Sequence, residues 1–198
     1  MSGTKASTTS TRRHEILVVA ARVFADKGIM NATVRDIGQE VGILSGSLYH
    51  HFESKDQMIE EVLRPVVDDL DVRFGRIVDT VDDPLERVRQ VMLVSFAEAA
   101  QRPEQARIFR NDAHHFAEIS RLAFVETQRL GLLTMVVDAL KAGQQQGRVR
   151  PDLDPEVGAV ALFDMVFGST RWLRARGDDM ATIGEQLTNV FLTGIAPH

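Results

Sequence analysis

The sequence contains no cysteine. This absence excludes disulfides, thiolate metal sites and cysteine nucleophiles, and it is typical of a protein in the reducing cytoplasm. Long hydrophobic runs are also missing, because the longest uncharged apolar stretch near the middle spans residues 130–137, far short of a bilayer. Residues 1–11 are small and polar and lack the apolar segment of a secretory signal. We therefore expect a disordered tail over residues 1–11 and a cytoplasmic protein with no membrane partner.

The alternation of apolar and polar residues that marks β-strands is nearly absent as well. Apolar residues recur instead at helical spacing, and 44% of the chain is apolar, which suits a packed core. The sequence predicts an all-α protein of about nine helices. Three short helices within residues 12–55 would form one domain, and the helices of residues 56–198 a larger one.

The front domain has the signals of three short helices. An apolar stripe on the first helix ends at Gly28, Thr33 begins the second with Asp36 placed as in a capping box, and Gly42 breaks the chain before a third helix at residues 45–51. The last two helices have the dimensions of a helix-turn-helix, which lays its second helix in the major groove of DNA. The same geometry also occurs in many proteins that do not bind DNA.

Charge is unevenly spread along the chain. The formal net charge is −5, yet residues 1–55 hold seven Lys and Arg side chains against five acids, so the front end is mildly basic. In the third helix Leu48 would point inward with Phe52. Small residues, hydroxyls and an imidazole would then face outward, where they can approach phosphates and base edges.

These residues also carry a family resemblance. The segments 33–38, 41–42, 46–52 and 54–55 resemble the N-terminal signature of the tetracycline-repressor (TetR) family, over about residues 12–62. The resemblance implies a homodimeric transcription regulator, not an enzyme, that binds a double-stranded DNA operator and is released from it by a small molecule. Together, the outward positions and the resemblance give as DNA-contact candidates Thr33, Arg35, Leu44, Ser45, Gly46, Ser47, Tyr49, His50 and Lys55.

The start of the recognition helix departs from the family pattern. Family members commonly have Ser-Lys there, whereas this chain has Leu44-Ser45. We expect Leu44 either to meet a thymine methyl group or to pack against the first helix.

The two last helices suggest a dimer interface. The helix from Pro155 is apolar almost all round, so it needs burial on several sides, and the final helix carries one apolar stripe. Two such helices from each of two chains would form a four-helix bundle, although they could instead complete the core of a monomer. We expect Asp164 to be buried, paired with Arg171 or with a ligand. The interface candidates are Val160, Asp164, Arg171, Trp172, Ile183, Leu187, Val190 and Phe191.

Large apolar side chains of the middle helices suggest a ligand pocket, although each could equally belong to an ordinary core. The pocket candidates are Met92, Phe96, Phe109, Asn111, His115, Phe116, Phe124, Met135, Phe163 and Phe167. Asp112, His114 and His115 also raise an enzymatic or metal-binding alternative. No nucleophile accompanies them, and adjacent helical residues diverge by about 100°. We therefore expect no catalytic residue, no metal and no cofactor.

Two further segments refine the resemblance. Residues 43–52 and 150–154 are similar to TetR members that control lipid or steroid catabolism, whose inducers are acyl-CoA thioesters. An apolar inducer would tilt the fourth helix, which contains Pro65, and change the spacing of the two recognition helices. The alternative is a DNA-binding regulator or architectural protein with no small-molecule ligand.

Overall fold

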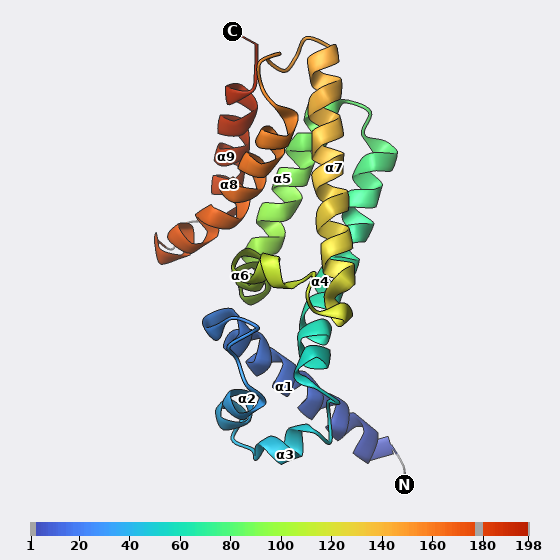
Figure 1. Ribbon diagram of the computed structural model, residues 1–198, viewed down its shortest axis with the longest axis vertical. Helices are drawn as coiled ribbons and strands as arrows, with labels where there is room; N and C mark the ends of the chain where they lie inside the picture. Colours follow the sequence, from blue (N-terminus) through green and yellow to red (C-terminus); the bar gives the residue numbers. More distant parts are fainter. Residues whose placement is uncertain (1–2, 177–179, 198) are drawn as a thin grey trace. The chain divides into compact units, whose positions relative to one another are not determined.

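A computed structural model describes residues 3–176 and 180–197, with side chains described for residues 11–169 and 181–197. Within these ranges every regular element is helical, as predicted (Figure 1). The α-helices are α1 (Gly3–Lys27), α2 (Val34–Val41), α3 (Ser45–Leu48), α4 (Lys55–Thr80), α5 (Pro84–Gln101), α6 (Pro103–Asp112), α7 (Ala123–Gln145), α8 (Pro155–Arg176) and α9 (Met180–Gly194). Two 3₁₀ turns, η1 (Ala113–His115) and η2 (Ser120–Leu122), lie between α6 and α7.

The predicted start and stop signals are confirmed. Thr33 caps α2 with a reciprocal capping box through Asp36, and Asp83 caps α5 with Pro84 in its first turn. The three glycines at the predicted breaks, residues 28, 42 and 147, all have positive φ, which a side chain would disfavour. Local chemistry therefore sets most of the helix ends.

The bounds of α1 and of α3 differ from the prediction. α1 begins at Gly3, where a disordered tail was expected over residues 1–11, because a helix already formed at residues 12–27 can add turns without a new nucleation step. α3 is α-helical only over Ser45–Leu48, and residues 49–51 follow as a turn, with His51 N–H donating to the Leu48 carbonyl at 2.9 Å. The helix predicted at 45–51 is therefore shorter than expected and ends at Leu48.

Contacts divide the chain into two compact units, and the first comprises residues 1–67 and 107–126. Its core gathers α1 side chains such as Ile16 and Phe24, the inward residues Leu48 and Phe52, and Met58 of α4. Residues 107–126 contribute to the same core through Ile108, Phe116 and Leu122. Packing therefore extends this unit beyond the predicted 12–55 domain, because the apolar faces of 56–67 and 107–126 are buried on it.

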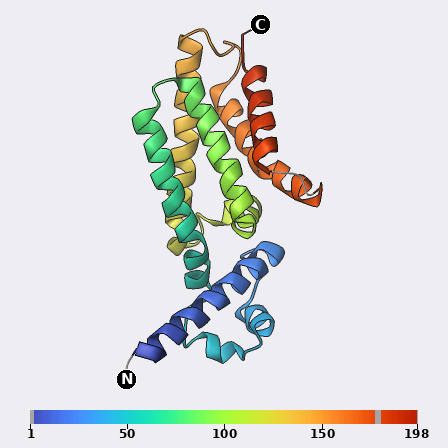
Figure 2. The ribbon, with the colours of Figure 1, turned by 180° about the vertical axis from the view of Figure 1, so that it is seen from behind.

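The second unit comprises residues 68–106 and 127–198. α5 packs against α8 and α9, which also contact each other, and the three helices lie side by side in both views (Figures 1 and 2). Gly184 permits the close approach of α9, since a Cβ there would lie 2.9 Å from the Cβ of Phe96. The core of this unit includes Met92, Phe96 and Phe191.

Candidate nucleic-acid interface

The turn between α2 and α3 is tightly packed. Ile43 N–H donates to the Gly38 carbonyl at 2.9 Å, and a Cβ on Gly38 would lie 3.0 Å from the Ile43 oxygen. That oxygen is backbone and cannot swing aside, so only glycine fits at position 38 without a shift of the turn. Leu48 and Phe52 are buried beneath α3, as predicted. The geometry is that of a helix-turn-helix with a closely packed turn.

An exposed face remains on the outer side of this turn. Leu44 is 81% exposed and Tyr49 is 59% exposed, both high for large apolar or aromatic side chains. The Leu44 side chain therefore does not pack against α1, which removes one of its two predicted roles. Of the other candidates, Thr33, Arg35, Gly46 and His50 are exposed, and Ser45, Ser47 and Lys55 are half-buried.

Lys55 binds backbone carbonyls of the chain itself. Its Nζ donates to the carbonyl oxygens of Ile29, Met30 and Ala32 at 2.8, 3.3 and 3.1 Å. An ammonium group has three donors, and these three bonds use all of them. Within one chain the side chain therefore fastens the turn between α1 and α2, and its predicted phosphate contact stays a prediction.

At the start of α2, the carboxylate of Asp36 is bonded by two side chains. Lys27 donates to Asp36 at 2.6 Å, and the Thr33 hydroxyl donates to the other oxygen of Asp36 at 2.7 Å. These hydrogen bonds, that of Lys27 above all, lower the pKa of Asp36 to about 2. In the part of the chain that the structure describes, Arg35 makes no ion pair, so its guanidinium is available to a partner outside the chain.

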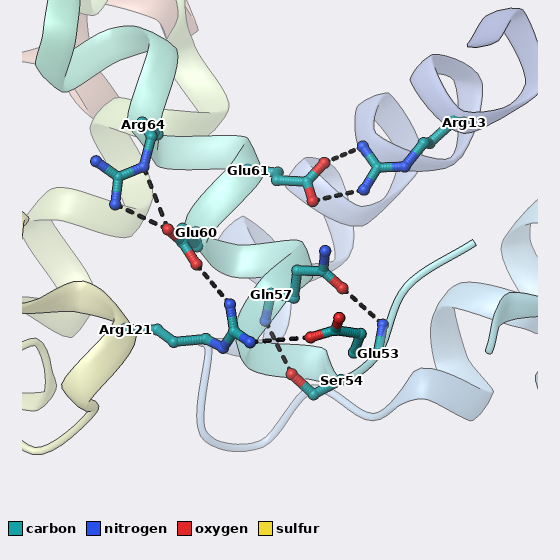
Figure 3. Close-up of polar contacts among 8 residues, drawn as sticks. All are labelled: Arg13, Glu53, Ser54, Gln57, Glu60, Glu61, Arg64 and Arg121. Atoms are coloured by element: carbon teal, nitrogen blue, oxygen red, sulfur yellow. Dashed lines mark hydrogen bonds and ion pairs between the residues drawn. The ribbon is translucent and has the colours of Figure 1, made fainter. Parts of the chain in front are cut away.

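Arg13 binds at the far end of the recognition segment, which comprises α3 and the residues that directly follow it, 45–52 in all. Its guanidinium forms two hydrogen bonds to the carboxylate of Glu61, one of them at 2.6 Å (Figure 3). The same guanidinium lies 4.5 Å from the ring centre of Phe52. Its Nε donates to the His51 carbonyl at 3.4 Å. Sequence patterns could not reveal this contact, because the two charged partners are 48 positions apart and share no helical repeat.

The predicted pocket residues are divided between the two units. Phe109, Phe116 and Phe124 belong to the core of the first unit, and Asn111 is exposed there. Met92, Phe96, Met135, Phe163 and Phe167 lie in the second. Several of the apolar members are fully buried in ordinary packing, so the shared pocket remains a prediction.

The paired histidines lie side by side in η1. The rings of His114 and His115 lie against each other with centroids 3.9 Å apart, instead of diverging as they would on an α-helix, because η1 changes the local winding. His115 Nδ1 lies 3.2 Å from a Glu118 oxygen. Among the described residues, no three or more His, Asp or Glu side chains are placed to hold a metal ion.

The dimer candidates fall into two groups. Val160 and Val190 are 51% and 62% exposed within one chain, whereas Phe191 is buried in its own unit. Asp164 is exposed within one chain, on the outer side of α8, so its predicted burial at a dimer interface stays a prediction. Ile183 and Leu187 are half-buried, and Arg171 and Trp172 lie outside the residues whose side chains are described.

Comparisons with known proteins agree with this geometry. Residues 16–62 match the family described as bacterial regulatory proteins, tetR family, and residues 81–195 match the tetracyclin repressor-like C-terminal domain. The chain is 41% identical over 187 residues to the HTH-type transcriptional repressor KstR2 of Mycolicibacterium smegmatis, covering 94% of this chain and 91% of the relative. No helix among the described residues is long and apolar enough to span a membrane.

Two solved structures have the same fold. The ketosteroid transcriptional regulator KstR2 of Mycobacterium tuberculosis superposes with a TM-score of 0.84 at 38% identity, covering 94% of this chain and 96% of that one. AibR in complex with isovaleryl coenzyme A and operator DNA superposes with a TM-score of 0.74 at 23% identity, covering 93% and 98%. The chain is a DNA-binding transcription regulator, not an enzyme, and belongs to the tetR family of bacterial regulatory proteins.

Proposed function

We propose that this protein is a homodimeric repressor that controls genes for the breakdown of steroids or related lipids. The observation that carries the proposal is the similarity to the KstR2 repressors, which extends over 94% of the chain and so includes both units. A relative at this identity shares the regulatory domain as well as the DNA-binding helices. The proposal therefore concerns what the protein senses as well as what it binds.

The DNA-binding side is proposed to be the exposed face around α3. Ser45, Gly46 and Ser47 let the backbone approach the groove, while Tyr49 and His50 contact phosphates or base edges. Thr33 and Arg35, at the start of α2, are placed to contact the backbone of the duplex. Leu44 is the apolar exception in this face, and we assign it to a thymine methyl group.

Dimerisation through α8 and α9 would give two such faces. Val160 and Val190 are exposed apolar side chains on neighbouring helices, the type of surface that a symmetric four-helix seam covers. Two recognition helices about 34 Å apart would read a palindrome whose half-sites lie one turn apart.

The proposed inducer is an apolar small molecule carried as an acyl-CoA thioester. The same fold has been found with isovaleryl coenzyme A and operator DNA in one complex, and KstR2 is described as a ketosteroid transcriptional regulator. The ligand would bind more tightly to the state whose recognition helices no longer fit adjacent grooves. A coupling of about 1–3 kcal/mol is expected, equivalent to a 5- to 150-fold loss of operator affinity.

The full burial of Met92 and Phe116 favours a second candidate, a regulator whose body is filled and binds no ligand. One titration separates the two. Fluorescently labelled duplexes from the region flanking the gene would be bound by the protein and then titrated with a steroid-derived acyl-CoA, a short straight-chain acyl-CoA and free coenzyme A. Release by the steroid thioester alone supports the proposal, and unchanged affinity with all three supports the ligand-free regulator.

A further inference from the structure

Two ion pairs connect η2 with the chain that leaves the recognition helix. Arg121 Nη1 donates to a Glu60 oxygen of α4 at 3.0 Å, and its Nη2 donates to a Glu53 oxygen at 3.0 Å (Figure 3). Glu53 directly follows Phe52, the last buried residue of the recognition segment. One guanidinium therefore spans from the segment before α7 to the end of the DNA-binding face, within a single compact unit.

Glu60 binds a second arginine, Arg64, besides Arg121. Arg64 donates to the same Glu60 carboxylate at 2.8 and 3.2 Å and lies 3.8 Å from the ring centre of Phe124. Bonds from Arg64 and Arg121 keep the pKa of Glu60 below its usual value, so it stays ionised at neutral pH. α4 thus holds two side chains of the 120–124 segment at once, Arg121 by charge and Phe124 by stacking.

The recognition segment is consequently held from two sides. Glu60 and Glu61 are neighbours on α4, and helical neighbours point about 100° apart, so each takes an arginine from a different element. Arg13 of α1 bonds to Glu61 and to the His51 carbonyl, whereas Arg121 of η2 bonds to Glu60 and Glu53. Figure 3 shows the two arginines reaching α4 from different sides.

Of the two arginines that bind α4, only Arg121 lies in a segment with predicted ligand-pocket residues. Arg13 comes from α1, inside the DNA-binding helices themselves. Arg121 lies in the segment that also carries Phe116 and Phe124, both in the core of the first unit and both pocket candidates. A shift of that segment would therefore be transmitted to Glu53 through a charged, directional contact.

We propose that Arg121 is a positioning residue for DNA binding: its bonds to Glu53 and Glu60 fix the end of the recognition segment and make operator affinity depend on the 120–124 segment. The inference rests on the proposed function only in that α3 reads the operator. Glu53 is 77% exposed, and exposed ion pairs are individually weak. The expected effect of losing the contact is therefore about two- to fivefold in operator affinity.

The test compares Arg121→Gln with Arg107→Gln. Arg107 makes a similar surface ion pair in the same unit, to Asp26 at 2.7 Å, and that pair involves none of residues 50–60, so it is the matched control. Tyr49 is the only tyrosine of the chain, and incorporation of 3-fluorotyrosine therefore places one ¹⁹F label on the recognition segment. The ¹⁹F spectrum of the full-length protein, its thermal midpoint, and operator affinity at several salt concentrations would be measured for each variant.

We expect the ¹⁹F resonance of Tyr49 to shift or broaden in Arg121→Gln and in Glu53→Gln, and to stay in place in Arg107→Gln. Operator affinity of Arg121→Gln should fall about two- to fivefold with an unchanged salt slope. An unchanged resonance in Arg121→Gln, or an equal change in Arg107→Gln, would overturn the proposal. A salt slope smaller by about 0.9 would also overturn it, because Arg121 would then contact a phosphate directly.

The spectroscopic comparison needs no DNA and is therefore independent of the proposed function. If the wild-type protein bound no operator, the proposed function would fail while the ¹⁹F comparison still decided whether Arg121 positions the recognition segment. The double variant Arg121→Gln/Glu53→Gln should match Arg121→Gln alone in its ¹⁹F spectrum, because the second change removes a partner already lost. Additive changes would contradict a direct contact between the two side chains.

Discussion

The ammonium of Lys55 donates to the carbonyl oxygen of Ile29 at 2.8 Å, and two more carbonyls of the same turn take its remaining donors. A cation that the family resemblance assigns to DNA is thus used inside the protein. It ties the first turn of α4 to the end of α1, the two elements between which the helix-turn-helix is held.

This relationship predicts the outcome of Lys55→Met, which keeps most of the aliphatic stem but removes the donors. Three carbonyls lose a charged partner, so the free energy of unfolding should fall by about 1.5–3 kcal/mol in urea denaturation. The salt slope of operator binding should not change. A stable variant with a slope smaller by about 0.9 would show that Lys55 leaves the turn to bind a phosphate.

Asp112 contacts the same turn from α6. Its Oδ1 accepts the Ile29 N–H at 3.1 Å, while its Oδ2 is buried with no hydrogen-bond partner among the described atoms. Burial raises the pKa of Asp112 above its ordinary 3.8, although the Ile29 bond and the nearby His115 and His114 oppose the shift. Since the folded state then holds the proton more tightly than the unfolded state, stability is lost as the pH rises from the ordinary pKa to the raised one.

Asp112→Asn should remove this loss while leaving an oxygen for Ile29. The free energy of unfolding of the variant, minus that of the wild type, is expected to rise with pH above 3.8 and to level off once the wild-type carboxyl is ionised. Urea titrations across that range measure it. Glu40→Gln, which removes an exposed carboxylate of the same unit that forms no ion pair with any described residue, is the control for charge alone. A difference that stays constant with pH would exclude the raised pKa.

If Leu44 contacts a thymine methyl group, operator binding should depend on that methyl group. Replacing one operator thymine at a time by uracil removes a single methyl group, and burial of one such group is worth about 0.8 kcal/mol. We expect the wild-type protein to lose about three- to fourfold affinity at one thymine per half-site, and Leu44→Ala to be insensitive to the same replacement. If Leu44→Ala kept the wild-type pattern of uracil sensitivity, the contact would be assigned to another residue.

If α8 and α9 form the dimer interface, charges introduced at Val160 and Val190 should weaken the dimer. Glutamate at both positions would place unpaired charges between the two chains and should weaken the dimer by about 3–5 kcal/mol, enough to give monomers at micromolar concentration in light scattering. Val72 of α4 is similarly exposed, at 54%, and Val72→Glu should leave the dimer intact. A dimeric Val160→Glu/Val190→Glu protein would place the interface elsewhere.

Much of the fold could be predicted from the sequence because helix ends depend on neighbouring residues. Thr33 and Asp83 cap their helices through hydrogen bonds to residues three positions further on. Gly28 and Gly42 end helices with a positive φ, a backbone conformation that glycine adopts at low cost. The inward placement of Leu48 follows from helical periodicity alone. These features require no knowledge of the rest of the chain.

The remaining features depend on distant residues and carry no local pattern. Lys55 could be read as a phosphate ligand because its charge is visible in the sequence, whereas the carbonyls that bind it lie 23–26 positions away. Likewise, nothing in residues 107–126 indicates that Asp112 and Arg121 pack with the DNA-binding helices, because hydrogen bonds and ion pairs between distant elements have no repeat to detect. Operator contacts share this limit, since their partner is another molecule.

The central claim, that α3 of two symmetric chains reads one duplex, is tested most directly by the stoichiometry of binding. The intact protein would be titrated into duplex fragments flanking its gene at low salt, with the mass of the complex measured by native mass spectrometry and affinity by fluorescence anisotropy. The structure predicts saturable binding of chains in pairs to a palindromic fragment, lost on replacing Gly46 with aspartate at the groove face. Failure of the wild-type protein to retain any such fragment, or binding by single chains, would contradict it.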